Sequence, residues 1–98
     1  MGVIVARLGT PESGRQSEAL AFAKKRAAAF KKLYGIDQEV RVRLGGPVGQ
    51  VLTVTRHDSL GEVETMKRKV IADTDAGKIP LAPPGVFKHS EEQIWLTQ

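Results

Sequence analysis

The chain has 98 residues, a formal net charge of +4 and no cysteine. This length allows one hydrophobic core and is too short for two, so we expect a single domain over residues 1–98. The lack of cysteine excludes disulfides, thiolate nucleophiles, iron–sulfur clusters and cysteine-based zinc sites, and it favours a cytoplasmic location. The apolar run near the N-terminus is too short for a signal sequence or a membrane span, so no membrane contact is expected.

The first half of the sequence predicts a strand followed by a long helix. Residues 3–8 are mostly β-branched or apolar and lead into a cluster of turn-forming residues. Ser13 and Gln16 have the spacing of a capping box, which predicts a helix start. Apolar side chains then recur at spacings of three and four without a proline or glycine, and Gly35 predicts the helix end. Much of the positive charge lies on this helix, and we interpret it mainly as a solvated face: Lys24, Lys25, Arg26, Lys31 and Lys32.

Two alternating segments predict a β-hairpin. Residues 38–44 and 50–56 alternate between polar and apolar side chains, and the turn sequence Gly45-Gly46-Pro47-Val48-Gly49 lies between them. Pairing that places Val42 opposite Leu52, and Val40 opposite Val54, gathers the large aliphatic side chains on one face. We therefore expect that register.

A second helix and a last strand complete the pattern. Ser59 and Glu62 form another capping-box spacing, and about fourteen helical residues follow. Residues 73–90 are rich in proline and glycine and predict an irregular segment, and residues 93–97 predict a final short strand. The order β-α-β-β-α-β is typical of a ferredoxin-like α+β fold, an antiparallel sheet with two helices on one face.

Alternation along the strands divides the sheet residues into two faces. We expect one set to pack against the helices: Ile4, Ala6, Leu8, Val40, Val42, Leu44, Leu52, Val54, Ile94 and Leu96. The other set mixes apolar residues with arginines: Val3, Val5, Arg7, Glu39, Arg41, Arg43, Val51, Thr53, Thr55, Gln93, Trp95 and Thr97. Because an apolar patch of that size on a small domain marks a partner or ligand surface, we expect something to cover the second face.

The order of elements, the Gly-Gly-Pro-Val-Gly hairpin leading into residues 50–60, and the Pro-Gly segment before the final Ile-Trp strand resemble dimeric α/β-barrel proteins. NIPSNAP-type and antibiotic-monooxygenase-type domains belong to that superfamily. The resemblance implies a homodimer in which two sheets face each other and enclose a cavity. It does not imply a particular reaction.

The sequence contains no specific catalytic or metal-binding motif. His57 and His89 could in principle approach a common site as a base or ligand, but two histidines in this length are close to background. Residues 73–77 lack the glycine and glutamate positions of a calcium loop, so we do not interpret them as a calcium site. We predict no metal site and no cofactor. Whether the chain is an enzyme stays open.

We therefore predict a homodimer that binds a small anionic or aromatic molecule in the cavity between facing sheets. One alternative is a cofactor-free monooxygenase-like enzyme acting in that cavity. Another is an RNA-binding module, which uses the same element order but needs aromatic side chains on the central strands that this sequence lacks. The predicted cavity-lining residues are Arg41, Arg43 and Trp95, followed by Arg7, Thr53 and His57.

Overall fold

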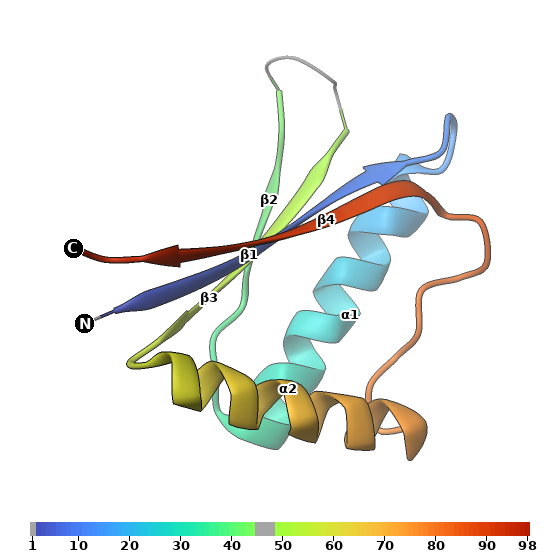
Figure 1. Cartoon of the computed structure of the whole chain (residues 1–98). Coiled ribbons are helices and arrows are strands. Elements are labelled where there is room, and N and C mark those ends of the chain that lie inside the picture. Colours follow the sequence, from blue (N-terminus) through green and yellow to red (C-terminus); the bar gives the residue numbers. More distant parts are fainter. Residues whose placement is uncertain (1, 45–48) are drawn as a thin grey trace.

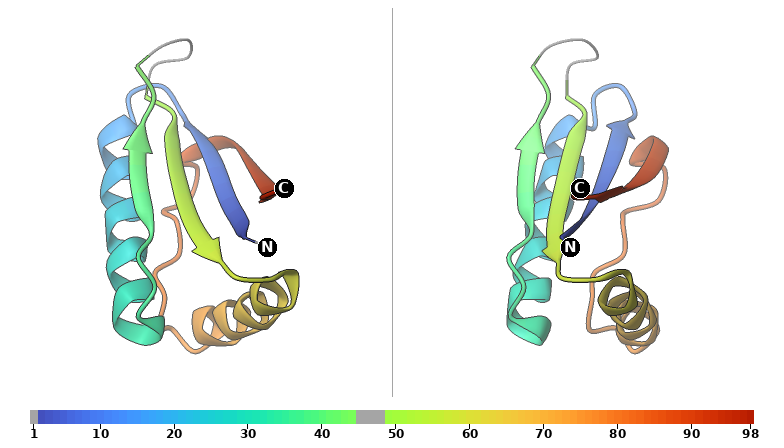
Figure 2. Two further views of the ribbon diagram at one scale, coloured as in Figure 1. Left: turned by 90° about the vertical axis from the view of Figure 1, so that its left-hand side faces the viewer. Right: turned by 60° about the vertical axis from the view of Figure 1, so that its left-hand side comes forward.

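The computed structural model describes residues 2–44 and 49–98. The elements follow the order β1 (Val3–Pro11), α1 (Gln16–Tyr34), β2 (Glu39–Val42), β3 (Val51–His57), α2 (Leu60–Asp75) and β4 (Phe87–Leu96). The strands form one antiparallel sheet in the order β2-β3-β1-β4 (Figure 1). Both helices pack on the same face of this sheet (Figure 2). The predicted β-α-β-β-α-β order and ferredoxin-like α+β fold are confirmed.

The two helix starts differ in how well the sequence predicted them. Ser59 caps α2 as expected, because its hydroxyl accepts the Glu62 N–H at 3.1 Å. Helix α1 begins later than its predicted cap: Arg15 occupies the N-cap position, no side chain caps the helix, and Gly14 before it has a φ of 80°. That left-handed conformation turns the backbone between Ser13 and the helix, so Ser13 is not the N-cap residue and the first capping-box prediction was wrong.

Arg15 fastens the start of α1 to the segment before β4. Its guanidinium donates to the Glu18 carboxylate at 3.1 and 2.8 Å and to the Pro84 carbonyl at 2.8 Å. The Glu12 N–H donates to the Val86 carbonyl at 2.9 Å. The irregular segment predicted over residues 73–90 is shorter than expected, because α2 extends to residue 75 and β4 already begins at Phe87.

The hairpin forms, but its register is shifted by one residue from the predicted one. Val42 lies opposite Val51, and Val40 lies opposite Thr53. The predicted turn at residues 45–48 lies outside the described residues. Neighbouring residues of a strand point to opposite faces of the sheet. A shift of one residue therefore pairs each β2 side chain with a β3 side chain of the other predicted face.

The two central strands are turned over relative to the prediction. Arg7 lies beside Thr53, and Val5 beside Thr55, on the side that faces the helices. The reason is that both faces of β1 and β3 carry apolar residues, so alternation alone does not show which face the helices cover. The expected core residues of these strands lie on the sheet face without helices: Ile4, Ala6, Leu8, Leu52 and Val54.

The outer strands follow the prediction more closely. Glu39 and Arg41 of β2 and Trp95 of β4 lie on the face without helices, as their pairing with β3 and β1 shows. Leu44, expected in the core, is 84% exposed because β2 ends two residues before it. We call the helix-free side of the sheet the open face. It comprises Ile4, Ala6, Leu8, Leu52, Val54, Glu39, Arg41, Arg56, Gln93 and Trp95.

A hydrogen bond ties the end of α1 to the end of α2. The Tyr34 hydroxyl donates to Asp73 Oδ2 at 2.5 Å, and burial together with the Asp73 carboxylate raises the pKa of Tyr34 to about 12. A raised pKa means that the neutral phenol stabilises the fold, and that this contribution is lost as the pH rises from 10 through 12.

Replacing Tyr34 with phenylalanine is therefore expected to lower the free energy of unfolding by about 1 kcal/mol at pH 7. Tyr34 is the only tyrosine in the sequence, so phenolate absorbance follows it alone. We expect a titration midpoint near pH 12 in the folded protein. A midpoint near the ordinary value of 10 would show that the bond to Asp73 does not form in solution.

Candidate functional site

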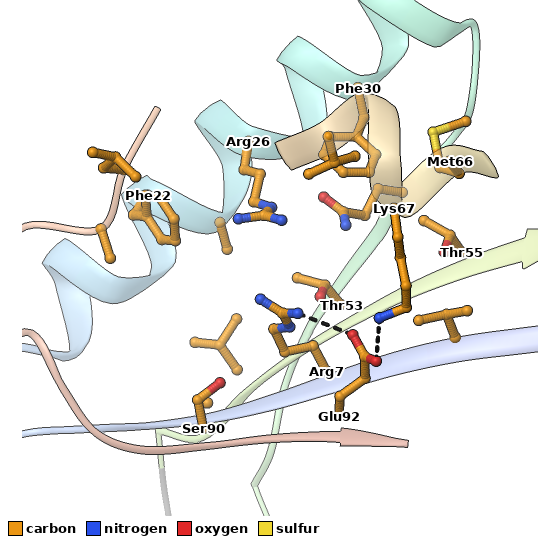
Figure 3. A pocket seen from close by; sticks show the side chains of 18 of the residues that line it. Arg7, Phe22, Arg26, Phe30, Thr53, Thr55, Met66, Lys67, Ser90 and Glu92 are labelled. Carbon is orange, nitrogen blue, oxygen red and sulfur yellow. Dashed lines mark hydrogen bonds and ion pairs between the residues drawn. The ribbon is translucent and has the colours of Figure 1, made fainter. Parts of the chain in front are cut away.

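A pocket of about 490 Å³ lies between the helix-facing side of the sheet and the two helices (Figure 3). We call it the sheet–helix pocket. Its size falls in the range of small-molecule sites. Most of its wall is apolar or aromatic and comes from both helices and three strands: Val5, Phe22, Phe30, Val51, Val63, Met66, Val70 and Phe87.

The charged side chains in the sheet–helix pocket include more cations than anions. Arg7 from β1 and Arg26 from α1 extend toward each other from opposite walls (Figure 3). Glu92 Oε2 of β4 accepts a hydrogen bond from Arg7 Nη2 at 2.9 Å, and Lys67 Nζ of α2 donates to its other oxygen, Oε1. Glu92 is the one carboxylate among the described residues that line the pocket, and Arg7 and Lys67 share it; Arg26 is the third cation of this lining.

Arg26 is half-buried and lacks an anionic partner. Its guanidinium carbon lies 5.4 Å from the centre of the Phe30 ring. No hydrogen bond or ion pair joins it to a carboxylate in the described part of the chain. Burial, and then the nearby Arg7 charge, lower the pKa of Arg26. The charged form of Arg26 is therefore less favourable in the folded protein than in water. A bound anion would stabilise that charge.

The pKa of Glu92 is also lowered, but in a carboxyl group a lowered pKa favours the charged form. The Lys67 ammonium, followed by Arg7, lowers the pKa of Glu92 below its usual 4.5. A lowered carboxyl pKa means that the ionised form stabilises the fold above pH 4.5, and that this contribution is lost as the pH falls through the folded-state pKa.

Replacing Glu92 with glutamine is therefore expected to lower the free energy of unfolding by about 1 kcal/mol at pH 7, and by much less at pH 3. Urea denaturation at the two pH values measures this difference. Glu64, whose ion pair with Arg68 is exposed on α2, serves as the control, and Glu64→Gln should have almost no effect. An equal loss for Glu92→Gln at both pH values would contradict the ion-pair account.

Polar groups also gather at another part of the sheet–helix pocket. Thr55 and His57 are both buried, and His57 Nε2 lies 2.9 Å from Thr55 Oγ1. Gln38 Oε1 and His57 Nδ1 are buried atoms without a hydrogen-bond partner. All three residues line the pocket, so a ligand could supply the missing partner of Gln38.

The six predicted site residues lie in three different places in the structure. Arg7, Thr53 and His57 line the sheet–helix pocket. Arg41 and Trp95 lie on the open face, where Trp95 is 60% exposed. Arg43 follows β2 and donates to Gln50 Oε1 at 2.9 Å, away from the pocket lining.

The two histidines do not share a site. His57 pairs with Val3 at the beginning of β1, whereas His89 pairs with Thr10 near its end. Seven residues of extended strand span about 23 Å, so the idea of a common histidine site was wrong. Among the described residues, His, Asp and Glu form no cluster of three that could hold a metal ion.

The open face has an apolar centre and charged edges. Ala6 and Val54 are buried between their neighbours, and Leu8 and Leu52 are half-buried. On β2 and β3, Arg56, followed by Arg41, binds Glu39 and lowers its pKa. Both charge signs are therefore present around an apolar surface that neither helix covers.

Sequence reasoning missed three charged residues of the sheet–helix pocket, namely Arg26, Lys67 and Glu92. A signal for Arg26 was present: Phe22 and Phe30 lie four residues before and after it, and that spacing places all three side chains along one helix face. Lys67 and Glu92 lacked such a signal, because their pairing depends on the placement of β4 beside α2.

No protein-family model and no curated protein matches this sequence. Several solved structures, however, are similar in fold. A NIPSNAP family protein from Agrobacterium tumefaciens has a TM-score of 0.80 and 19% identity, covering 100% of this chain and 94% of the other. A NIPSNAP domain protein from Burkholderia xenovorans has a TM-score of 0.79 and 12% identity, covering 98% and 94%.

A Deinococcus radiodurans protein provisionally assigned as an antibiotic biosynthesis monooxygenase has a TM-score of 0.62 and 14% identity, covering 100% and 93%. In the described part of this chain, neither helix is long and apolar enough to cross a membrane. At these identities the likeness concerns the fold. The structural neighbours of the chain are thus NIPSNAP family and antibiotic-biosynthesis-monooxygenase-like proteins, and the chain shares their ferredoxin-like fold.

Proposed function

We propose that the protein binds a small organic anion with an apolar or aromatic body in the sheet–helix pocket. The observation that carries this proposal is the half-buried Arg26 guanidinium, which faces Arg7 and has no carboxylate partner among the described residues. A carboxylate accepts two parallel hydrogen bonds from a guanidinium. The aromatic walls on both sides of Arg26 would hold the apolar body of the ligand.

This proposal moves the predicted cavity. The sequence suggested a space between the sheets of two protomers, whereas the pocket found here lies within one protomer, between its sheet and its helices. The proposed chemical class of the ligand is the same as the predicted one, because Arg7 and Thr53, two of the residues predicted to line the cavity, line the sheet–helix pocket.

We propose in addition that two copies associate through the open face. Neither helix covers its apolar centre, where Leu8 and Leu52 are half-buried, and Trp95 is exposed on the neighbouring strand β4. A two-fold dimer brings the same surface of both copies together, so the carboxylate of Glu39 in one copy could meet arginines of the other. A cytoplasmic location remains the expectation from the cysteine-free sequence.

A thermal-shift comparison of acids with their neutral amides tests the ligand proposal. Phenylacetate and indole-3-acetate are expected to raise the melting temperature, and phenylacetamide and indole-3-acetamide are not, because only the acids supply a charge to Arg26. Acids and amides with equal effects, or no effect of either, would overturn the proposal.

Of the two alternatives, RNA binding has less support. The central strands β1 and β3 present aliphatic residues on the open face, where base stacking would require aromatic ones. The fold likeness to the Deinococcus protein supports a monooxygenase-like activity as an extension of ligand binding in the same pocket. Oxygen consumption with a bound acid would favour that extension.

A further inference from the structure

Thr55, His57 and Glu62 lie in a row from the sheet–helix pocket toward the surface. Thr55 and His57 are two residues apart on the same face of β3, and their side chains are joined at 2.9 Å. The His57 side chain is 3% exposed, and its other ring nitrogen, Nδ1, lies 3.5 Å from Glu62 Oε1. The hydroxyl lines the pocket, the imidazole is next to it, and the carboxylate, 43% exposed, is at the outer end.

The start of α2 holds Glu62 in this place. Its N–H donates to Ser59 Oγ at 3.1 Å, and its Oε2 accepts the Asp58 N–H at 3.3 Å. The capping box that begins the helix therefore also turns the second oxygen of Glu62 toward His57. Capping alone would not require a buried histidine at this position.

The partners of His57 determine which ring nitrogen carries the proton. A neutral imidazole has one donor nitrogen and one acceptor nitrogen. Nδ1 makes no hydrogen bond among the described residues, but it lies 3.5 Å from the Glu62 carboxylate, and a negative charge favours a proton on the ring nitrogen nearest to it, so we assign the proton to Nδ1. Nε2 is then the acceptor, and the Thr55 hydroxyl donates to it. The oxygen of Thr55 keeps its lone pairs for a group in the pocket.

We propose that these three residues form a proton relay that accepts a proton from a ligand carrying a weakly acidic O–H group. The ligand proton moves to Thr55 Oγ1 while the Thr55 proton moves to His57 Nε2, which leaves an anionic ligand oxygen and an imidazolium whose Nδ1–H faces Glu62. Thr55 is the group that would touch the ligand, and Glu62 is a positioning residue. This inference rests on the proposed binding of a ligand in the sheet–helix pocket.

The position of the relay fits the cations of the pocket. Thr55 is two residues from Thr53, which pairs with Arg7, and two residues of strand span about 7 Å. A ligand of the proposed class could therefore place its carboxylate at Arg7 and Arg26 and its O–H at Thr55. The excess of cations in the pocket would stabilise the oxygen anion that forms.

Nitrogen NMR of ¹⁵N-labelled protein tests the relay without a ligand, because the ring-nitrogen shifts of His57 distinguish its two tautomers. We expect the Nδ1–H form in the wild type and a larger share of the Nε2–H form in Glu62→Gln, which keeps the shape of the side chain. A wild-type Nε2–H form, or tautomers unchanged in Glu62→Gln, would overturn the assignment. A purely structural histidine would show the same change, so the relay also requires proton transfer from a bound ligand.

A coloured ligand tests the proton transfer itself. The probe is 4-hydroxy-3-nitrophenylacetate, whose phenolate absorbs visible light, and calorimetry measures its binding separately. At equal saturation and pH, the bound probe should hold less phenolate in Thr55→Val and His57→Gln than in the wild type. Equal phenolate in all three proteins would overturn the relay alone, whereas failure of the probe to bind would overturn the proposed function together with the relay that rests on it.

Discussion

Replacing Arg26 with methionine is expected to weaken the binding of phenylacetate by about 10- to 100-fold, the loss typical of one charge-assisted hydrogen-bonded contact. Methionine keeps an unbranched apolar stem between Phe22 and Phe30, so the walls of the sheet–helix pocket should stay intact. Because the wild-type guanidinium is half-buried without an anionic partner, its removal should not destabilise the free protein. Calorimetric titration measures the binding, and thermal denaturation measures the stability.

The matched control is Lys25→Met. Lys25 is the neighbouring residue on α1, it is exposed, and it does not line the pocket. This variant removes the same unit of charge and should bind phenylacetate as the wild type does. Equal weakening in both variants would mean that the anion senses the overall charge of the helix rather than Arg26, and it would contradict the proposed site.

Replacing Leu52 with aspartate is expected to convert a dimer into a monomer. Leu52 lies in the apolar centre of the open face, between Leu8 and Arg41. In a two-fold interface every substitution occurs twice, so two carboxylates would be buried in one apolar contact. Analytical ultracentrifugation at micromolar concentration should show the wild type as a dimer and the variant as a folded monomer.

Leu60→Asp provides the control for this change. Leu60 begins α2, is 52% exposed, and lies off the open face. An acidic residue is well tolerated in the first turn of a helix, so this variant should remain dimeric. A monomeric wild type at micromolar concentration would contradict the open-face interface directly.

The sequence predicted the order of elements because each element has local signals. Ser59 and Glu62 marked the start of α2, and Gly35, with a φ of 68°, marked the end of α1. These signals depend on a few neighbouring residues, so they can be recognised without knowledge of the tertiary structure. Ser13 misled because the left-handed Gly14 separates it from the helix.

The faces of the central strands could not be predicted in the same way. Val3 and Val5 on one face of β1 are about as apolar as Ile4, Ala6 and Leu8 on the other. Two polar residues, Arg7 and Thr53, suggested an exposed face, yet they lie under the helices because they line a pocket rather than a close-packed core. Polarity at alternate positions therefore does not distinguish a solvated face from the wall of a pocket.

The misplaced faces explain why the candidate site residues are divided between the two sides of the sheet. Arg7, Thr53 and His57 are on the helix-covered side of β1 and β3, whereas Arg41 and Trp95 are on the open face of β2 and β4. The prediction placed Arg7, Arg41, Thr53 and Trp95 on one face, and the one-residue error in the register of the hairpin is part of the same mistake.

The most direct test of the central claim is a crystal structure of the protein with phenylacetate bound. We expect the carboxylate at the guanidinium groups of Arg26 and Arg7, with the ring against Phe22 and Phe30, inside one protomer. A ligand seated against Trp95 and Arg41 between two facing sheets, or a sheet–helix pocket that stays empty at saturating phenylacetate, would contradict the account.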